Sequence, residues 1–350
     1  MARIIKDVPA SLAGLCDAYV EVDTATPCIL QLTDMQIIDA DQRRTPDRIS
    51  EEKIRYWAGE RVDANMLSHV RDLVAQSRPD LILITGDIVY GEFDDSGRMQ
   101  KMFADFLDGL EIPWAITFGN HDNESMMGIE WQCDLYEGAQ YGLFCRGNCT
   151  GFGNYTVGIV YRGELIRVLY LLDSHGCRAA SPEAKIPKGL YEDQLQMVKQ
   201  TSDAIEARTG ARVPGFAAYH IPTLEFVLAL REKYGREVTD YFTIGADQAP
   251  LDGDFGCHYE KYKPLDLPAE DLTPFWQACG VDGVFVGHCH KINTSMLYNG
   301  VRLTFGLKTG VYDYFSNGQL GGTVINCAKD GAFAVHHITT LVPYDPPFLK

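Results

Sequence analysis

The chain has 350 residues, of which 46% are hydrophobic and 23% are charged, a composition typical of a globular protein with one large core or two modest cores. Its 31 basic and 48 acidic residues give a net charge of −17, which repels phosphate backbones and excludes nucleic acid as an expected partner. The first residues contain no uninterrupted apolar stretch of signal-peptide type, and no later run reaches transmembrane length. We therefore expect a cytoplasmic protein that has no membrane partner.

Nine short apolar runs predict β-strands, and their near-continuous hydrophobicity indicates strands buried on both faces. In chain order they cover residues 28–34, 80–87, 113–120, 166–174, 213–220, 282–288, 301–306, 321–327 and 332–338. Amphipathic segments predict helices over residues 51–76, 98–110, 190–208 and 224–235. This alternation is typical of α/β layers. Because no repeat or long linker divides the sequence, we expect one domain over residues 1–350, with its motifs between about 28 and 310.

Side chains with metal-ligating atoms stand where five of these runs end. They are Asp34, Asp87, Asn120 with the adjacent His121, His220, and His288. Because sites in such sheets collect outside the carboxyl ends of strands, we expect these groups to meet in space. His288 and His290 stand two apart and project to one face, which favours a shared ion over a thiol site at Cys289. Carboxylate, amide and imidazole ligands together suit Zn, Mn or Fe.

The order of these residues resembles the calcineurin-like metallophosphoesterase superfamily and, within it, the purple-acid-phosphatase-like branch. The matching segments are Asp34-x-Gln36, Gly86-Asp87, Gly119-Asn120-His121-Asp122, His220 and Gly287-His288-x-His290. Five spaced motifs in the right order are far more specific than any single one. The resemblance implies an α/β fold, a four-layer α/β/β/α sandwich of two mixed sheets flanked by helices. It also implies a binuclear centre of two divalent or mixed-valence metal ions.

The resemblance further implies a role for each matching side chain. The metal ligands would be Asp34, Asp87, Asn120, His220, His288 and His290. Asp87 would bridge both ions, Asp34 and His290 would complete the first site, and the other three would complete the second. A hydroxide shared by ions about 3.5–4 Å apart would attack phosphorus in line. His121 would donate a hydrogen bond or proton to the phosphoryl or leaving oxygen, while Asp122 orients its ring.

The chain departs from the superfamily pattern at Gln36, where the common motif has a histidine. A carboxamide oxygen is a weaker ligand than imidazole, so Gln36 is either a direct ligand or a hydrogen-bonding residue behind the ligands. Tyr90 stands three residues after Asp87, the offset at which purple acid phosphatases place a tyrosinate ligand. The alternative for Tyr90 is a packed ring with a hydrogen-bonded hydroxyl.

Three further side chains are candidates for substrate contact. His175 ends another predicted strand, and its alternative is a loop histidine hydrogen-bonded to the backbone. Arg98 and Lys308 are cations that would suit a phosphate, and their alternative is a solvated surface position.

These observations predict a hydrolase that acts on phosphoric ester bonds of a small phosphorylated substrate. A phosphomonoester is favoured because an acidic chain repels polyanions. The alternatives are a phosphodiesterase, a metal-binding scaffold of the same fold without turnover, and a thiol enzyme built on Cys289. The pair Cys145 and Cys149 is a further, weaker candidate for a structural zinc. The sequence does not predict the oligomeric state or the leaving group.

Overall fold

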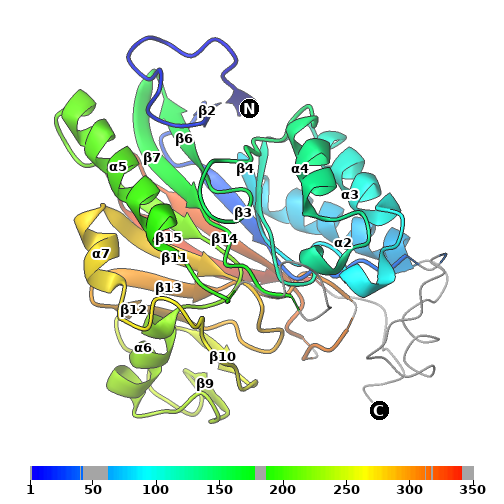
Figure 1. Cartoon of the computed structure of the whole chain (residues 1–350). Helices are drawn as coiled ribbons and strands as arrows, with labels where there is room; N and C mark the ends of the chain where they lie inside the picture. Colours follow the sequence, from blue (N-terminus) through cyan, green and yellow to red (C-terminus); the bar gives the residue numbers. More distant parts are fainter. Residues whose placement is uncertain are drawn as a thin grey trace.

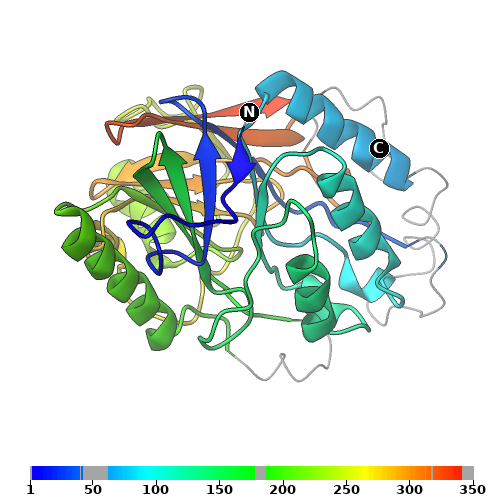
Figure 2. The same cartoon turned by 90° about the horizontal axis from the view of Figure 1, so that it is seen from above.

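The near-continuous apolar runs form the central strands of two β-sheets, which pack face to face between two layers of helices (Figure 1). The computed structural model describes residues 2–39, 41, 62–177, 187–311, 313–316 and 318–340. Seen from above, the helices lie on both outer sides and the sheets between them (Figure 2). This arrangement confirms the predicted α/β fold with two mixed sheets.

The smaller sheet has five strands in the order β15-β14-β3-β4-β5. Three of them are parallel neighbours, namely β3 (Cys28–Leu32), β4 (Leu81–Thr85) and β5 (Trp114–Thr117). The other two, β14 (Gly321–Cys327) and β15 (Phe333–Thr339), are antiparallel additions. Because β3, β4 and β5 run in one direction, the segments that follow them emerge at the same edge.

The larger sheet has eight strands in the order β1-β2-β6-β7-β8-β11-β13-β12. Their bounds are β1 (Arg3–Ile4), β2 (Ala18–Val22), β6 (Tyr155–Tyr161), β7 (Glu164–Leu171), β8 (Gly215–Ala218), β11 (Val281–Val286), β12 (Ser295–Tyr298) and β13 (Val301–Phe305). The neighbours β7, β8, β11 and β13 are parallel, so their carboxyl ends also share one edge. A separate hairpin joins β9 (Phe242–Ile244) to β10 (Gly256–His258).

Helices cover the outer face of each sheet (Figure 1). Beside the five-stranded sheet lie α2 (Val62–Ser77), α3 (Arg98–Asp108) and α4 (Ile129–Glu137), together with the 3₁₀ turns η1 (Gly91–Phe93) and η2 (Asp122–Glu124). The eight-stranded sheet is covered by α5 (Glu192–Thr209), α6 (Leu224–Tyr234) and α7 (Thr273–Ala278). One apolar core joins the inner faces, with Ile82 of β4 and Phe285 of β11 both fully buried in it.

All nine predicted strands are present, and the helices predicted over 98–110, 190–208 and 224–235 are confirmed within a few residues. The helix predicted over 51–76 is observed from Val62, while residues 51–61 lie outside the described part. The sequence did not predict β1, β2, β6, β9, β10, β12, α4 or α7. Within the described ranges, no helix has the length and apolar character needed to cross a bilayer. The organisation as one domain stays a prediction.

A buried cation lies between the two sheets. Arg167 of β7 is 0% exposed, donates to Asp282 at 2.7 Å and to the Gly331 carbonyl at 2.6 Å. Its guanidinium also lies 4.0 Å from the ring centroid of Phe216. A buried charge of this kind is stable only while its partners remain in place.

Candidate metal centre

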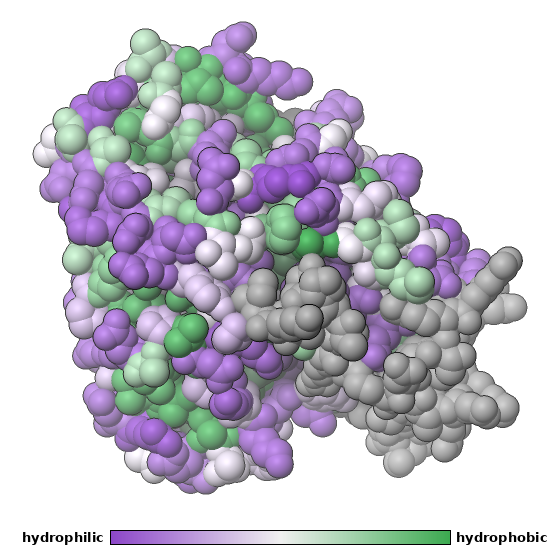
Figure 3. Space-filling view, in the orientation of Figure 1, coloured by the Kyte–Doolittle hydropathy of each residue, from purple (hydrophilic) through white to green (hydrophobic). Residues whose placement is uncertain are grey.

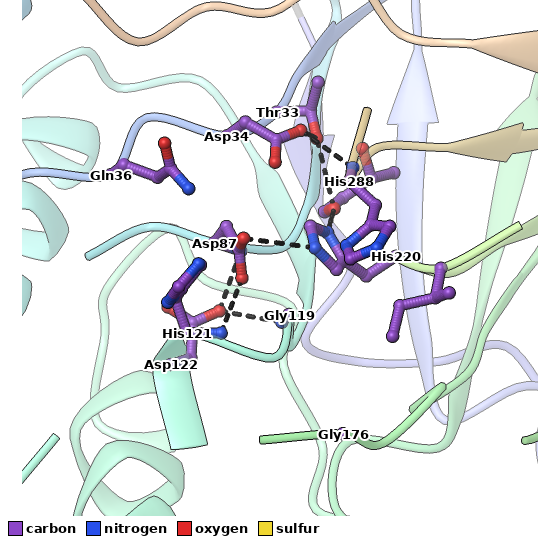
Figure 4. Close-up of polar contacts among 12 residues, drawn as sticks. Thr33, Asp34, Gln36, Asp87, Gly119, His121, Asp122, Gly176, His220 and His288 are labelled. Carbon is purple, nitrogen blue, oxygen red and sulfur yellow. Dashed lines mark hydrogen bonds and ion pairs between the residues drawn. The ribbon is translucent and has the colours of Figure 1, made fainter. Parts of the chain in front are cut away.

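Metal-ligating side chains from both sheets meet where the carboxyl edges of the sheets face each other (Figure 4). Asp34 and Asp87 follow β3 and β4, whereas His220 and His288 follow β8 and β11. Asp34, Asp87 and His220 are buried, and each offers one ligand atom within 4.8 Å of the other two. The strand ends therefore bring together, from three distant segments, three of the groups that the sequence predicted to meet.

The backbone turns sharply where three of these side chains leave their strands. Asp34, Asp87 and His288 have φ angles of 53°, 52° and 72°, in the left-handed region that non-glycine residues seldom occupy. Each such residue costs about 1–3 kcal/mol and persists only where its surroundings fix it. A β-carbon on Gly119 would lie 2.2 Å from Asp87 Oδ1, so only glycine leaves room for that carboxylate.

Several ligand atoms at this edge are buried without a hydrogen-bond partner among the described residues. They are Asp34 Oδ1, Asn120 Oδ1 and His220 Nε2. The His220 Nδ1 atom pairs with the Thr85 carbonyl at 2.8 Å, which leaves Nε2 facing Asp87 Oδ2 at 3.2 Å. Burial lowers the pKa of His220, but the charge of Asp87 outweighs it and raises the pKa to about 9. Because buried polar atoms are normally paired, three unpaired ligand atoms fit a bound cation.

His290 completes a second group of ligand atoms around Asp34. Its Nδ1 atom pairs with the Tyr314 carbonyl at 3.0 Å, and its Nε2 atom lies 3.4 Å from Asp34 Oδ1. The other Asp34 oxygen accepts from the Thr33 hydroxyl at 2.7 Å and from the His288 N–H at 3.0 Å. Asp34 is thereby held with Oδ1 turned toward His290, as a shared ion would require.

His121 lies beside these ligands but pairs with a carboxylate that the sequence did not single out. Its Nδ1 atom is 2.6 Å from Oε2 of Glu124, whose side chain is fully buried. The ring of Tyr90 stacks on the imidazole, with 4.3 Å between the centroids. The 3₁₀ turn η2 brings Glu124 under the ring, and no family motif marks this residue. The role of Tyr90 as a metal ligand stays a prediction.

Asp122 does not orient the His121 ring, so that prediction is wrong. Its carboxylate accepts from the backbone N–H groups of Asp87 and Ile88, both at 2.9 Å, and of Gly119 at 2.8 Å. A carboxylate at the start of a turn satisfies such amides readily, because each of them lacks another partner at the strand end. Asp122 therefore joins the segments after β4 and β5 and holds Asp87 in place.

Gln36 and Lys308 form a buried pair beside Asp34. Gln36 is 0% exposed, and its Oε1 atom accepts from the Lys308 ammonium at 2.9 Å. Lys308 is 1% exposed, so the prediction of a solvated surface cation is wrong, while a contact of Lys308 to substrate stays a prediction. The sequence places these residues 272 positions apart, and only the fold brings them together.

The other two substrate candidates lie elsewhere. Arg98 forms ion pairs with Asp39 and Asp41. The His175 Nδ1 atom pairs with the Gly189 carbonyl at 2.9 Å, which agrees with a loop histidine hydrogen-bonded to the backbone. Neither side chain lines the cavity at the centre. A substrate contact by either is not supported.

A cavity of about 240 Å³ opens above the ligands. Asp87, His121, His288 and His290 line its floor. Lys188, Lys261 and Lys263 line its mouth, together with Tyr262 and Tyr314. Hydrophilic side chains cover much of the surface in the same orientation as Figure 1, with apolar ones in small groups (Figure 3). Glu260 and Asp313 also line the cavity, so its lining carries charges of both signs.

The three cysteines singled out in the sequence, Cys289, Cys145 and Cys149, do not form the sites considered for them. Cys289 is 2% exposed, and burial raises the pKa of its thiol well above the usual value, which contradicts the thiol-enzyme alternative. The Cys145 and Cys149 thiols point to different backbone carbonyls, those of Leu143 and Asp193. Neither belongs to a group of ligand atoms close enough to hold an ion.

Comparisons with known proteins identify the family of the chain. A family model described as calcineurin-like phosphoesterase matches residues 29–291. "Probable inactive purple acid phosphatase 14" of Arabidopsis thaliana is 25% identical over 315 residues, which cover 84% of this chain and 72% of the relative. "Phosphatase DCR2" of Saccharomyces cerevisiae is 27% identical over 246 residues, which cover 66% of this chain and 39% of the relative. The solved structure "GAP50 the anchor in the inner membrane complex of Plasmodium" is 10% identical, with a TM-score of 0.46, and covers 92% of this chain and 88% of its own.

Proposed function

Because the chain belongs to the calcineurin-like phosphoesterase family, we propose that it is a metal-dependent hydrolase of a small phosphomonoester. One observation carries the proposal. Buried ligand atoms of Asp34, Asp87 and His220 lie within 4.8 Å of one another, beside a cavity that is lined by Asp87 and His121. Carboxylate, amide and imidazole atoms in this arrangement suit two ions of Mn, Zn or Fe.

The chain's own residues would divide into two groups of ligands. Asp34 and His290 would hold one ion, Asn120, His220 and His288 the other, with the Asp87 carboxylate between them. An anion is required at the shared position because two dications repel each other. When bound, the ions would neutralise charge on the phosphoryl oxygens and lower the pKa of the attacking water.

His121 would act on the substrate itself. Its ring lines the cavity, while Glu124 holds Nδ1 and Tyr90 stacks on one face. These contacts fix the orientation of the ring. We propose that the opposite ring nitrogen, Nε2, donates to the phosphoryl or leaving oxygen. Residues that only fix the ring, such as Glu124, act through His121.

The size and charge of the cavity support a small monoester. A volume of about 240 Å³ lies below the usual range of about 300–1,000 Å³ for ligand sites, so only a small substrate fits. The phosphoryl group of a monoester carries two negative charges near neutral pH. The three lysines of the lining attract such a dianion, although Glu260 and Asp313 line the same cavity, and the net charge of −17 repels large polyanions.

The proposal is tested with purified protein, added Mn²⁺ and two probes, para-nitrophenyl phosphate and bis-para-nitrophenyl phosphate. We expect hydrolysis of the monoester that is lost with a chelator and regained with Mn²⁺. Faster turnover of the diester would instead support a phosphodiesterase.

The scaffold alternative has one structural observation in its favour, the Gln36 amide beside the group of Asp34 and His290. It predicts bound metal without hydrolysis of either probe. If the wild type is active, a His121→Ala variant that loses hydrolysis but keeps its metal content would support catalysis, because metal binding alone would then be insufficient.

A further inference from the structure

The pair of Gln36 and Lys308 is the feature that the proposed mechanism leaves unused. The Lys308 ammonium donates to Gln36 Oε1 and to the Asp34 carbonyl, each at 2.9 Å. Both side chains are buried, at 0% and 1% exposure, next to a ligand of the proposed metal centre. A buried lysine paired with neutral oxygens rather than a carboxylate is uncommon, which suggests a role beyond packing.

The pairing fixes the direction of the Gln36 amide. Lysine has donors only, so the amide atom that faces Lys308 must be the carbonyl oxygen. The amide nitrogen then lies on the opposite side, and it is buried without a partner among the residues described. Figure 4 shows this nitrogen on the side of Asp87, with the oxygen turned away.

The backbone also holds Gln36 in place. Its φ angle of 48° lies in the left-handed region, and its N–H donates to the Asp87 carbonyl at 2.9 Å. Rotating the amide by half a turn would place its NH₂ group against the Lys308 ammonium, donor against donor. The oxygen is therefore committed to Lys308, and the group that faces the centre has no lone pair for a metal.

We propose that Gln36 is a hydrogen-bond donor to a phosphoryl oxygen rather than a metal ligand, and that Lys308 is the positioning residue that aims its amide. This inference rests on the proposed phosphoesterase function, because it assigns the acceptor to the substrate. It also implies unequal metal affinities. The group of Asn120, His220 and His288 binds its ion more tightly than the group of Asp34 and His290, which lacks a ligand at position 36.

The test measures binding rather than turnover. Mn²⁺ stoichiometry and affinity are measured by titration calorimetry, followed by the affinity of the Mn²⁺-loaded protein for inorganic phosphate. In Gln36→Met, which removes the donor at similar length, we expect both Mn²⁺ affinities to stay unchanged and phosphate affinity to fall about tenfold. Weaker binding of the second Mn²⁺, or unchanged phosphate affinity, would overturn the inference.

Lys308→Met is the second variant, because Gln36→Met leaves Lys308 one acceptor short and could impair folding. If Lys308 only aims the amide, the single variant loses phosphate affinity while the double variant with Gln36→Met loses no more than Gln36→Met alone. Additive losses would contradict the positioning role. Wild-type protein that binds no Mn²⁺ would overturn the proposed function as well, which distinguishes that failure from failure of this inference alone.

Discussion

The two groups of ligands in the candidate metal centre arise in the same way but are completed differently. Each combines strand-end residues from the two sheets, Asn120 with His220 and His288 in one group and Asp34 with His290 in the other. Beside the second group, however, a carboxamide turned by Lys308 stands where an imidazole is usual. The fold thus keeps residue 36 beside the centre, while the buried pair with Lys308 turns the amide nitrogen, a donor, away from the lysine.

The largest effect should come from removing one histidine of each group. We expect His220→Ala to lose its ion and all measurable hydrolysis, because it removes a ligand from the tighter group. His290→Ala should lose only the weaker ion and keep about one Mn²⁺ per chain. Metal analysis of both variants after gel filtration checks this, and equal losses from both would break the distinction between the groups.

The next largest effect is expected at His121, where a substitution should reduce turnover without loss of metal from either group of ligands. His121→Ala should lower kcat by about 10²–10⁴-fold, the range for loss of a general acid. Metal content should stay that of the wild type, since His121 is not among the proposed ligands. Steady-state kinetics with para-nitrophenyl phosphate, beside metal analysis of the same preparation, measure both quantities. A loss of metal in parallel with activity would count against the assignment.

Substitutions of the neighbouring carboxylates Glu124 and Asp122 should have smaller effects on turnover and stability. Glu124→Gln should lower kcat by about 10–100-fold while leaving folding stability nearly unchanged, because it disturbs only the orientation of His121. Asp122→Asn should instead lower the free energy of unfolding by about 1–3 kcal/mol, since it disturbs buried amides of the segments after β4 and β5. Denaturant unfolding and steady-state kinetics of both variants test these two roles. A loss of kcat in Asp122→Asn and a loss of stability in Glu124→Gln would reverse them.

The smallest effect is expected at Cys289, between the two histidines of the 288–290 motif. Cys289→Ala should change kcat by less than about twofold, because the thiol is buried and its pKa is raised by burial. Alkylating reagents should leave native activity intact, whereas chelators abolish it. Rapid inactivation by a thiol reagent would reopen the thiol-enzyme alternative.

The fold could be predicted largely from the sequence because its central parallel strands are buried on both faces. Such strands have a strong local signal, as in β4, where all five residues are buried. Strands near the edges of the larger sheet, such as β2 and β12, have partly exposed positions, which weakens that signal. The turn that brings Glu124 under His121 is also local. Nothing in the residue types indicates that Glu124, and not the nearby Asp122, pairs with His121.

The ligands of the candidate site were predictable for a related reason. Asp34, Asp87 and His220 each end a recognisable strand, so topology alone places them together. The Gln36 and Lys308 pair was not predictable, because lysine is usually exposed and its burial here depends on backbone hydrogen bonds between the segments that follow β13 and β3. Long-range pairs between a neutral and a charged side chain leave no spacing pattern in one sequence.

The origin of the ligands in two different sheets has a mechanical consequence. Asp87 and Asn120 come from the five-stranded sheet and His220 and His288 from the eight-stranded one, so an ion bound by all four is a cross-link between layers. Ligands that bind only the folded state stabilise it by an amount that grows with their concentration. The melting temperature should therefore rise with free Mn²⁺, and the edge where the sheets meet should exchange amide hydrogens faster when metal is removed. A metal-loaded centre would then stabilise the packing of the two sheets.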